Sequence, residues 1–247
     1  MAQPRPPSEP QRRPDAFVTT HWSLILASRE PGRSGSDALD RLCRTYWPPL
    51  FAYARRDGLS PHDAEDAVQA FLARVLARQD FDTVHPDRGR FRSFLLKAFR
   101  NFLVSRARGE QSSKRGGGTQ TLPLDIEALE ASIQSSRIDD APPDKAFDRE
   151  WARQVMERAL ERLAEQHRSP SQARLFESLK HVLVEGETLR GANELAATLG
   201  ISPGALATAA TRLRQRYRAL IEDEVRQTLL DPDDLKEELR TLWAAWN

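Results

Sequence analysis

The stretch GANELAATLGISPGALATAATRLRQRYR, Gly191 to Arg218, predicts two helices that meet at a sharp turn. Leu195 and Leu199 stand one helical turn apart, which places both on one face of a helix. Gly200 follows them and can adopt the positive φ that a tight turn requires. The small Ala196 allows a second helix to cross closely. The pattern predicts a helix-turn-helix, although an ordinary helical hairpin shares some of these features.

The second helix of this stretch has one apolar side and one polar, cationic side. Ser202 can cap its start, and Pro203 suits its first position. From Pro203 to Arg218 there are four arginines and no acidic residue, as a recognition helix in a DNA major groove requires. The apolar side comprises Leu206, Ala210, Leu213, Tyr217 and Leu220. The polar side comprises Thr208, Thr211, Arg212 and Gln215, flanked by Arg214, Arg216 and Arg218.

A second cationic helix is predicted by RFRSFLLKAFRNFLVSRAR, Arg90 to Arg108, which contains no acidic residue. Solvated helices usually mix both charge signs, because Glu and Lys one turn apart stabilise each other. Because all the charges on this helix are positive, a face that contacts phosphate groups is favoured over a face that is merely exposed to solvent. The buried face is expected to comprise Phe91, Phe94, Leu95, Ala98, Phe99, Phe102 and Leu103. The outward face is expected to comprise Ser93, Lys97, Arg100, Asn101, Val104 and Arg108, with Arg92 and Arg106 beside it.

The other helices follow from the same periodicity. Apolar residues recur at helical spacing while period-two alternation is scarce, so we predict an all-α fold. Asp37–Arg56 carries an apolar stripe that Pro48 and Pro49 are expected to kink or split. Ser60 and Pro61 are typical of the start of a further helix.

Length and composition limit the class of protein. The chain has 247 residues, 30% of them charged, and its net charge of +1 does not indicate a partner. Cys43 is the only cysteine, which excludes an intramolecular disulfide and fits a reducing cytosol. No apolar run approaches the length of a membrane span. We therefore expect a cytoplasmic protein without a membrane segment.

Changes in composition predict two helical domains joined by a long flexible linker. The linker combines a glycine- and serine-rich part with an acidic, proline-rich part. One hypothesis is that its acids mask the cationic helices in the free protein. The predicted units are a disordered arm (residues 1–15), a first helical domain (16–108), the linker (109–145), a helix-turn-helix domain (146–228) and a C-terminal helical extension (229–247).

Three stretches resemble the sigma factors of bacterial RNA polymerase, in particular the two-domain extracytoplasmic-function (ECF) type. YWPPLFAYARRDGLSPHDAEDAVQAFLARVLAR, residues 46–78, resembles the start of sigma region two. FDTVHPDRGRFRSFLLKAFRNFLVSRAR, residues 81–108, resembles its promoter-melting part. ANELAATLGISPGALATAATRLRQRYRALI, residues 192–221, resembles region four. The resemblance implies a protein that binds core RNA polymerase and directs promoter recognition and transcription initiation.

The resemblance also implies where each partner binds. In the family, an acidic-x-x-Gln pattern faces the clamp helices of the largest polymerase subunit, and here the matching residues are Asp63, Glu65, Asp66 and Gln69. The −10 promoter element would contact Arg92, Ser93, Lys97, Arg100 and Asn101, with Phe91 beside them. An acidic residue is common in the family where this chain has Ser105. The −35 element would contact Thr208, Thr211, Arg212, Arg214, Gln215 and Arg218.

The C-terminal stretch DPDDLKEELRTLWAAWN, residues 231–247, resembles an extension found in one branch of the family. Its apolar stripe predicts a helix. Trp243 and Trp246 either dock this helix on region four, or the helix simply caps the domain. An anti-sigma protein or another regulator is a further candidate partner.

Two other functions fit parts of the sequence. A helix-turn-helix regulator outside the polymerase would explain Pro203–Arg218 but would leave the remaining surfaces without a shared purpose. A nuclease would need Asp63, Glu65 and Asp66 to hold a metal, but acids at a helix start are commonly partners of the helix dipole. His62 with Asp66 is a weak ligand pair. We therefore expect no catalysis, no cofactor and no metal site.

Overall fold

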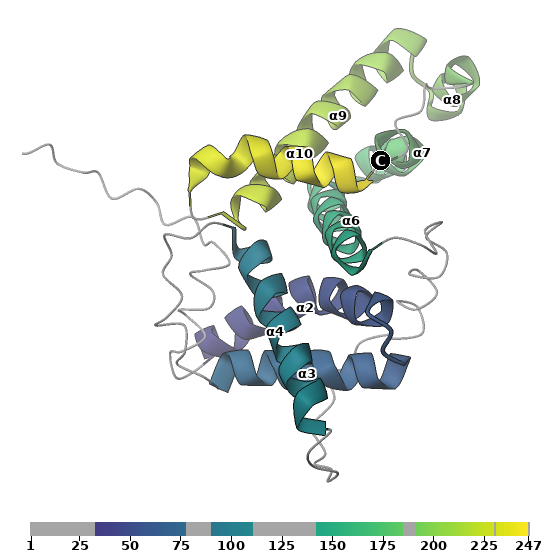
Figure 1. The fold of residues 1–247 in the computed structure, drawn as a ribbon. Helices are drawn as coiled ribbons and strands as arrows, with labels where there is room; N and C mark the ends of the chain where they lie inside the picture. The colour runs from purple at the N-terminus through teal and green to yellow at the C-terminus, as the bar shows by residue number, and fades with distance from the viewer. Residues whose placement is uncertain (1–32, 78–89, 111–141, 185–190, 230, 247) are drawn as a thin grey trace, which may run out of the picture.

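Helices make up the part of the chain that the computed structural model describes, namely residues 33–77, 90–110, 142–184, 191–229 and 231–246. In chain order these are α2 (Arg33–Arg56), α3 (Pro61–Ala77), α4 (Phe91–Glu110), α6 (Pro143–Glu165), α7 (Pro170–Val184), α8 (Ala192–Leu199), α9 (Pro203–Arg226), the short 3-10 helix η2 (Pro232–Asp234) and α10 (Leu235–Trp246) (Figure 1). No strand occurs in these ranges, and the all-α prediction is confirmed. Among the described helices, none combines the length and the apolar character that crossing a bilayer requires. The predicted N-terminal arm and most of the predicted linker lie outside the described residues.

The expected break in the first long helix does not occur. Helix α2 continues through Pro48 and Pro49, which are both buried. A proline within a helix removes one backbone hydrogen bond and crowds the preceding turn. Here Trp47, Leu50 and Phe51 on either side are almost fully buried, and their packing holds the helix together.

The start of α3 follows the local rules of helix capping. The backbone N–H of Asp63 donates to Ser60 Oγ at 3.2 Å, and Ser60 Oγ donates to the Asp63 carboxylate at 2.6 Å. Pro61 occupies the first helical position, as the sequence predicts. This pairing fixes the direction in which α3 leaves the turn after α2.

Aromatic side chains pack α4 against α2 and α3. Phe91 meets Tyr46 edge-on at 5.0 Å between ring centroids, and Phe99 lies 5.0 Å from Phe71. Phe91 and Phe99 are buried, whereas Phe102 is only half-buried. Such aromatic pairs stabilise beyond the area they bury. The predicted apolar face of this helix is confirmed as core.

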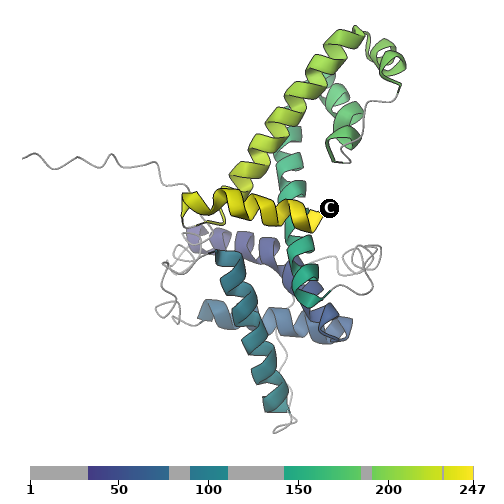
Figure 2. The same cartoon turned by 45° about the horizontal axis from the view of Figure 1, so that its top comes forward.

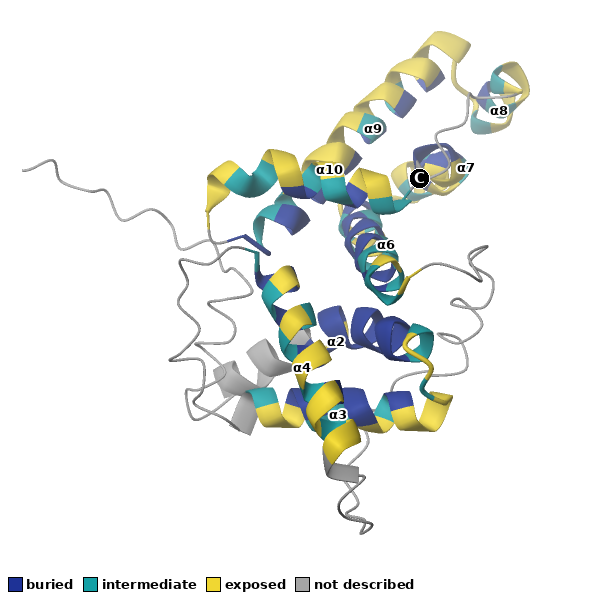
Figure 3. Ribbon diagram, viewed as in Figure 1, coloured by how far each residue is buried: buried dark blue, intermediate teal, exposed yellow. Residues whose placement is uncertain are grey.

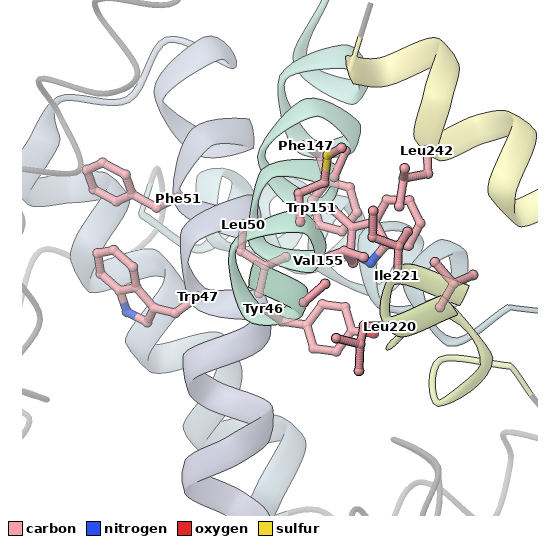
Figure 4. Packing of buried hydrophobic residues seen from close by; sticks show 14 of the residues in the cluster. Tyr46, Trp47, Leu50, Phe51, Phe147, Trp151, Val155, Leu220, Ile221 and Leu242 are labelled. Carbon is pink, nitrogen blue, oxygen red and sulfur yellow. The ribbon is translucent and has the colours of Figure 1, made fainter. Parts of the chain in front are cut away.

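The two halves of the described chain share one hydrophobic core. In both views α6 lies beside α2 on one side and beside α9 on the other (Figures 1 and 2). Tyr46 and Leu50 of α2 point toward α6, where Trp151 and Val155 are fully buried (Figure 4). The predicted helical domains are therefore packed together in this structure. We call this α2–α6 contact the apolar seam.

Polar contacts join α6 to α9 at the edge of this core. Glu224 of α9 is buried and accepts hydrogen bonds from Arg158 at 3.0 Å and from Arg162 at 2.7 Å. The Tyr217 hydroxyl donates to the Met156 carbonyl at 3.1 Å. These bonds satisfy polar groups that would otherwise be costly to bury, and they fix how α9 projects from α6.

The three tyrosines of the chain are expected to ionise at higher pH in the folded protein than they do when it is unfolded. Burial raises the pKa of Tyr46 and Tyr53 above the ordinary value, and it raises the pKa of Tyr217 to about 12. Because the folded pKa is raised, the contribution of each tyrosine to the free energy of unfolding is fully present below the unfolded pKa of about 10. This contribution is lost as the pH rises through the folded pKa. Tyrosinate absorbance should stay low near pH 10 and should rise together with the loss of helical circular dichroism. Titration of all three tyrosines near pH 10 in a still helical protein would contradict this.

Candidate nucleic-acid interface

The turn between α8 and α9 has the geometry that the sequence predicts. Gly200 ends α8 with φ of 68° and ψ of 29°, in the left-handed region that favours glycine. Ser202 caps α9 by accepting a hydrogen bond from the Ala205 N–H at 3.2 Å, and Pro203 is its first residue. Ala196 is buried where α8 meets α9. The predicted helix-turn-helix is therefore present.

The first half of α9 presents a polar surface away from the shared core. In Figures 1 and 2 this half projects from the rest of the molecule together with α8. Figure 3 shows its outer side as exposed, and the residues that face the core match the predicted apolar side. The exposed side chains are Thr208, Thr211, Arg212, Gln215, Arg216 and Arg218, while Arg214 is half-buried.

The hydroxyl groups on this surface are already oriented by the helix. Thr208 donates to the Gly204 carbonyl and Thr211 to the Ala207 carbonyl, each at 2.9 Å. Each hydroxyl oxygen can still accept a hydrogen bond, for example from the exocyclic amine of adenine or cytosine. Arg212 and Arg218 are exposed beside them and can reach base edges or phosphates.

Most of the predicted cationic face of α4 is open to solvent. Ser93, Lys97 and Asn101 are exposed along α4. Val104, Ser105 and Arg108 continue the same exposed surface toward the end of the helix. A row of small polar groups with cations fits a nucleic-acid backbone.

Arg92 departs from this surface and is buried. Its side chain retains only 6% exposure, and its guanidinium lies 4.7 Å above the Trp151 ring. It donates to both carboxylate oxygens of Glu238, at 2.8 and 3.1 Å, and also to Asp148. Burial by itself would lower the pKa of Arg92, but these carboxylates raise it overall, so the side chain stays charged. In this arrangement Arg92 does not reach DNA, contrary to the predicted contact with the −10 element from beside the outward face, and Phe91 is equally buried.

Arg100 is half-exposed and takes part in both an ion pair and the lining of a pocket. It forms an ion pair with Asp144 of α6 at 3.4 Å, which solvent screens because both side chains are about half exposed. It also lines an open pocket of about 610 Å³ between α4 and the turn before α3. Asp63, Ser60, Tyr53 and Val104 line the same pocket, so the structure brings a predicted −10 residue close to Asp63, one of the predicted polymerase-facing residues.

The acidic start of α3 is accessible, but its members differ. Asp66 is exposed, with 52% side-chain exposure, and its carboxylate lies 3.8 Å from His62 Nδ1. Glu65 is half-buried and accepts a hydrogen bond from Gln69 at 3.0 Å. Asp63 is exposed but engaged with Ser60. An arginine on a partner helix can therefore reach Asp66 without breaking a short hydrogen bond such as those of Asp63 and Glu65.

The sequence interpretation missed two carboxylates of this region. Glu237 and Glu238 of α10 pair with the cationic start of α4 although they are far away in the chain. The only signal in the sequence is that α10 begins with two adjacent acids. Within the described residues there is no group of three or more His, Cys, Asp or Glu side chains that could hold a metal ion.

Comparison with known protein families gives a match over most of the chain. The family model described as "ECF sigma factor" matches residues 33–227. No curated protein and no solved structure matches the chain. The matched range runs from the start of α2 to just beyond α9 and does not include α10.

Proposed function

Since this chain belongs to the ECF sigma factor family, we propose that it binds core RNA polymerase through α3, opens the −10 element with α4 and holds the −35 element with α9. The family match over α2 to α9 carries this proposal. The family is not a family of enzymes, and the polymerase supplies the chemistry. The polymerase and the promoter are in the cytoplasm, so we place the protein there.

The exposed side chains support each part of this division. Asp66 offers a carboxylate to a cation of the polymerase clamp helices, which would set register and speed encounter. Ser93, Lys97, Arg100 and Asn101 offer cations and small polar groups to the separated strands of the −10 element. Thr208, Thr211, Arg212 and Gln215 are placed to read base edges of the −35 element, with Arg218 near the backbone. An anti-sigma protein is a further candidate partner of these surfaces.

Transcription with purified core polymerase on a mixed promoter library is the direct test. A sigma factor directs initiation from a subset of promoters without any other sigma factor present. A helix-turn-helix regulator would give no transcript until a sigma factor is added. Failure of the purified protein to bind core polymerase, even at low salt, would refute the proposal.

Asp66→Arg is expected to weaken capture of core polymerase by about tenfold or more, which corresponds to roughly 1.4 kcal/mol. The new cation would face the partner arginine that the carboxylate now attracts. The fold should persist, because Asp66 is exposed and the contacts of α3 with α2 and α4 lie on its other side. The matched control is Glu165→Arg, which makes the same charge change at an exposed site on α6. Equal capture by both variants would remove Asp66 from the interface.

A further inference from the structure

Helix α10 joins both halves of the molecule by two different kinds of contact. Leu242 is fully buried, and with Leu239 and Trp246 it packs α10 onto α6 and α9. One turn before Leu242, the acids Glu237 and Glu238 reach across to α4. Figures 1 and 2 show α10 crossing beside α6 and α9. Its apolar side therefore holds it in place, while its first turn carries charge to the start of α4.

The charged contact is a buried network centred on Glu238. This side chain has no exposed surface, and it accepts hydrogen bonds from Arg92 and pairs with Arg90 at 3.2 Å. Arg90 also pairs with Glu237 at 2.6 Å. Asp148 of α6 completes the network on the other side of Arg92. Charges in such a place are costly to desolvate, so the network is held by its own pairing.

The two arginines cannot serve this network and a nucleic acid at once. Their donors already point at carboxylates, in the fork geometry that would otherwise bind phosphate. We propose that α10 is an autoinhibitory clasp: Glu237 and Glu238 occupy Arg90 and Arg92, so that docking of α10 on α4 and full engagement of the −10 strand by α4 exclude each other. This inference rests on the proposed role of α4 in binding the −10 element.

The chemistry of the contact suits a clasp that opens. The apolar seam between α2 and α6 buries Tyr46, Leu50 and Trp151. Separating the seam would expose these side chains to water, which is unfavourable, so the seam is expected to stay closed. The link from α10 to α4 consists of charged groups, which water or phosphate can solvate once they part. The clasp can therefore release α4 while α10 stays on α6 and α9. By linkage, whatever stabilises the docked clasp weakens DNA binding by the same factor.

The double variant Glu237→Gln/Glu238→Gln is expected to bind single-stranded DNA more tightly than the full-length wild type. The probe is a single-stranded oligonucleotide of mixed sequence that is as long as a −10 element. No polymerase is present. Arg90 loses both of its ion pairs, so the slope of log affinity against log salt should steepen by about 0.7, and Arg92, which Asp148 still holds, should add less. Near 0.1 M salt the affinity should rise by about tenfold. Adding Arg90→Gln should remove part of the gain, because one of the released cations is then missing.

The matched control is Glu161→Gln/Glu222→Gln, which removes two charges at exposed sites on α6 and α9. This control should leave the salt slope unchanged. If the buried substitution Glu238→Gln impairs folding, Glu237→Gln alone still tests the clasp, because Glu237 is 64% exposed and contacts Arg90. An unchanged slope in this folded single variant and in the double variant would overturn the clasp.

Hydrogen exchange of the wild-type protein separates this inference from the proposed function. Binding of core polymerase and a promoter should reduce the protection of the first turn of α10 and leave the amides of α6 protected. If the holoenzyme initiates transcription while that turn keeps its full protection, the clasp is refuted and the proposed function stands. If the wild type does not bind core polymerase, the proposed function itself fails.

Discussion

Arg92→Ala is expected to lower the free energy of unfolding of the free protein by about 3–5 kcal/mol. The change leaves Glu238 with no exposed surface and without its bidentate partner, and it leaves Asp148 without its nearest cation. Removing one partner of a buried network costs more than the network itself contributes, because the remaining charges stay desolvated. Burial raises the pKa of the Asp148 carboxyl, and the positive charge of Arg92 lowers it again. Chemical denaturation followed by circular dichroism measures the loss.

Arg100→Ala is the matched control for this prediction. The pair of Arg100 with Asp144 is about half exposed, so its removal should cost less than about 1 kcal/mol. The double variant Arg92→Met/Glu238→Met should recover part of the loss, since it removes two of the buried charges together. Equal losses for Arg92→Ala and Arg100→Ala would mean that Arg92 is solvated in the free protein, and the buried network would then be wrong.

Local rules were enough to predict the helix-turn-helix. Gly200, Ser202 and Pro203 each act through a backbone requirement that involves only neighbouring residues: a positive φ, a cap and a fixed φ. The buried side of α9 followed from its period because α9 packs along one stripe. The same reasoning identified the aromatic face of α4, since Phe91 and Phe99 repeat at helical spacing.

Arg92 shows where such reasoning fails. Helical periodicity gives the angle of a side chain around its own helix, but not which distant element covers it. The carboxylate that pairs with Arg92 lies 146 residues further along the chain. Nothing near Arg92 in the sequence distinguishes it from Lys97, which is exposed. The hypothesis that linker acids mask the cationic helices concerns residues outside those described and stays a prediction. Among the described residues, acids of α6 and α10 pair with α4.

The proline pair of α2 shows the same limit from the other direction. The local rule disfavours Pro48 and Pro49 within a helix, and the sequence therefore predicted a kink or split. Tertiary packing overrides that preference, because the residues around the pair are core residues and α2 packs against both α6 and α3. Contacts with these helices are thus the information that the sequence of α2 does not contain.

Trp151→Ala is expected to destabilise both halves of the described chain together, by about 3–5 kcal/mol. Trp151 is fully buried in α6, among side chains of α2, α9 and α10, as Figure 4 shows. Its loss opens a cavity in the apolar seam and removes the ring under the Arg92 guanidinium. Because the core is continuous, the fluorescence of the remaining tryptophans and the helical circular dichroism should report one shared transition at a lower denaturant concentration.

Trp151→Phe provides the control, because it keeps an aromatic ring and removes the indole N–H. That N–H is buried and finds no acceptor among the described residues, so its removal relieves part of the cost of the smaller side chain. The loss should therefore be clearly smaller than for alanine. Two separate transitions in Trp151→Ala, one for α2–α4 and one for α6–α10, would show that the seam does not couple the halves.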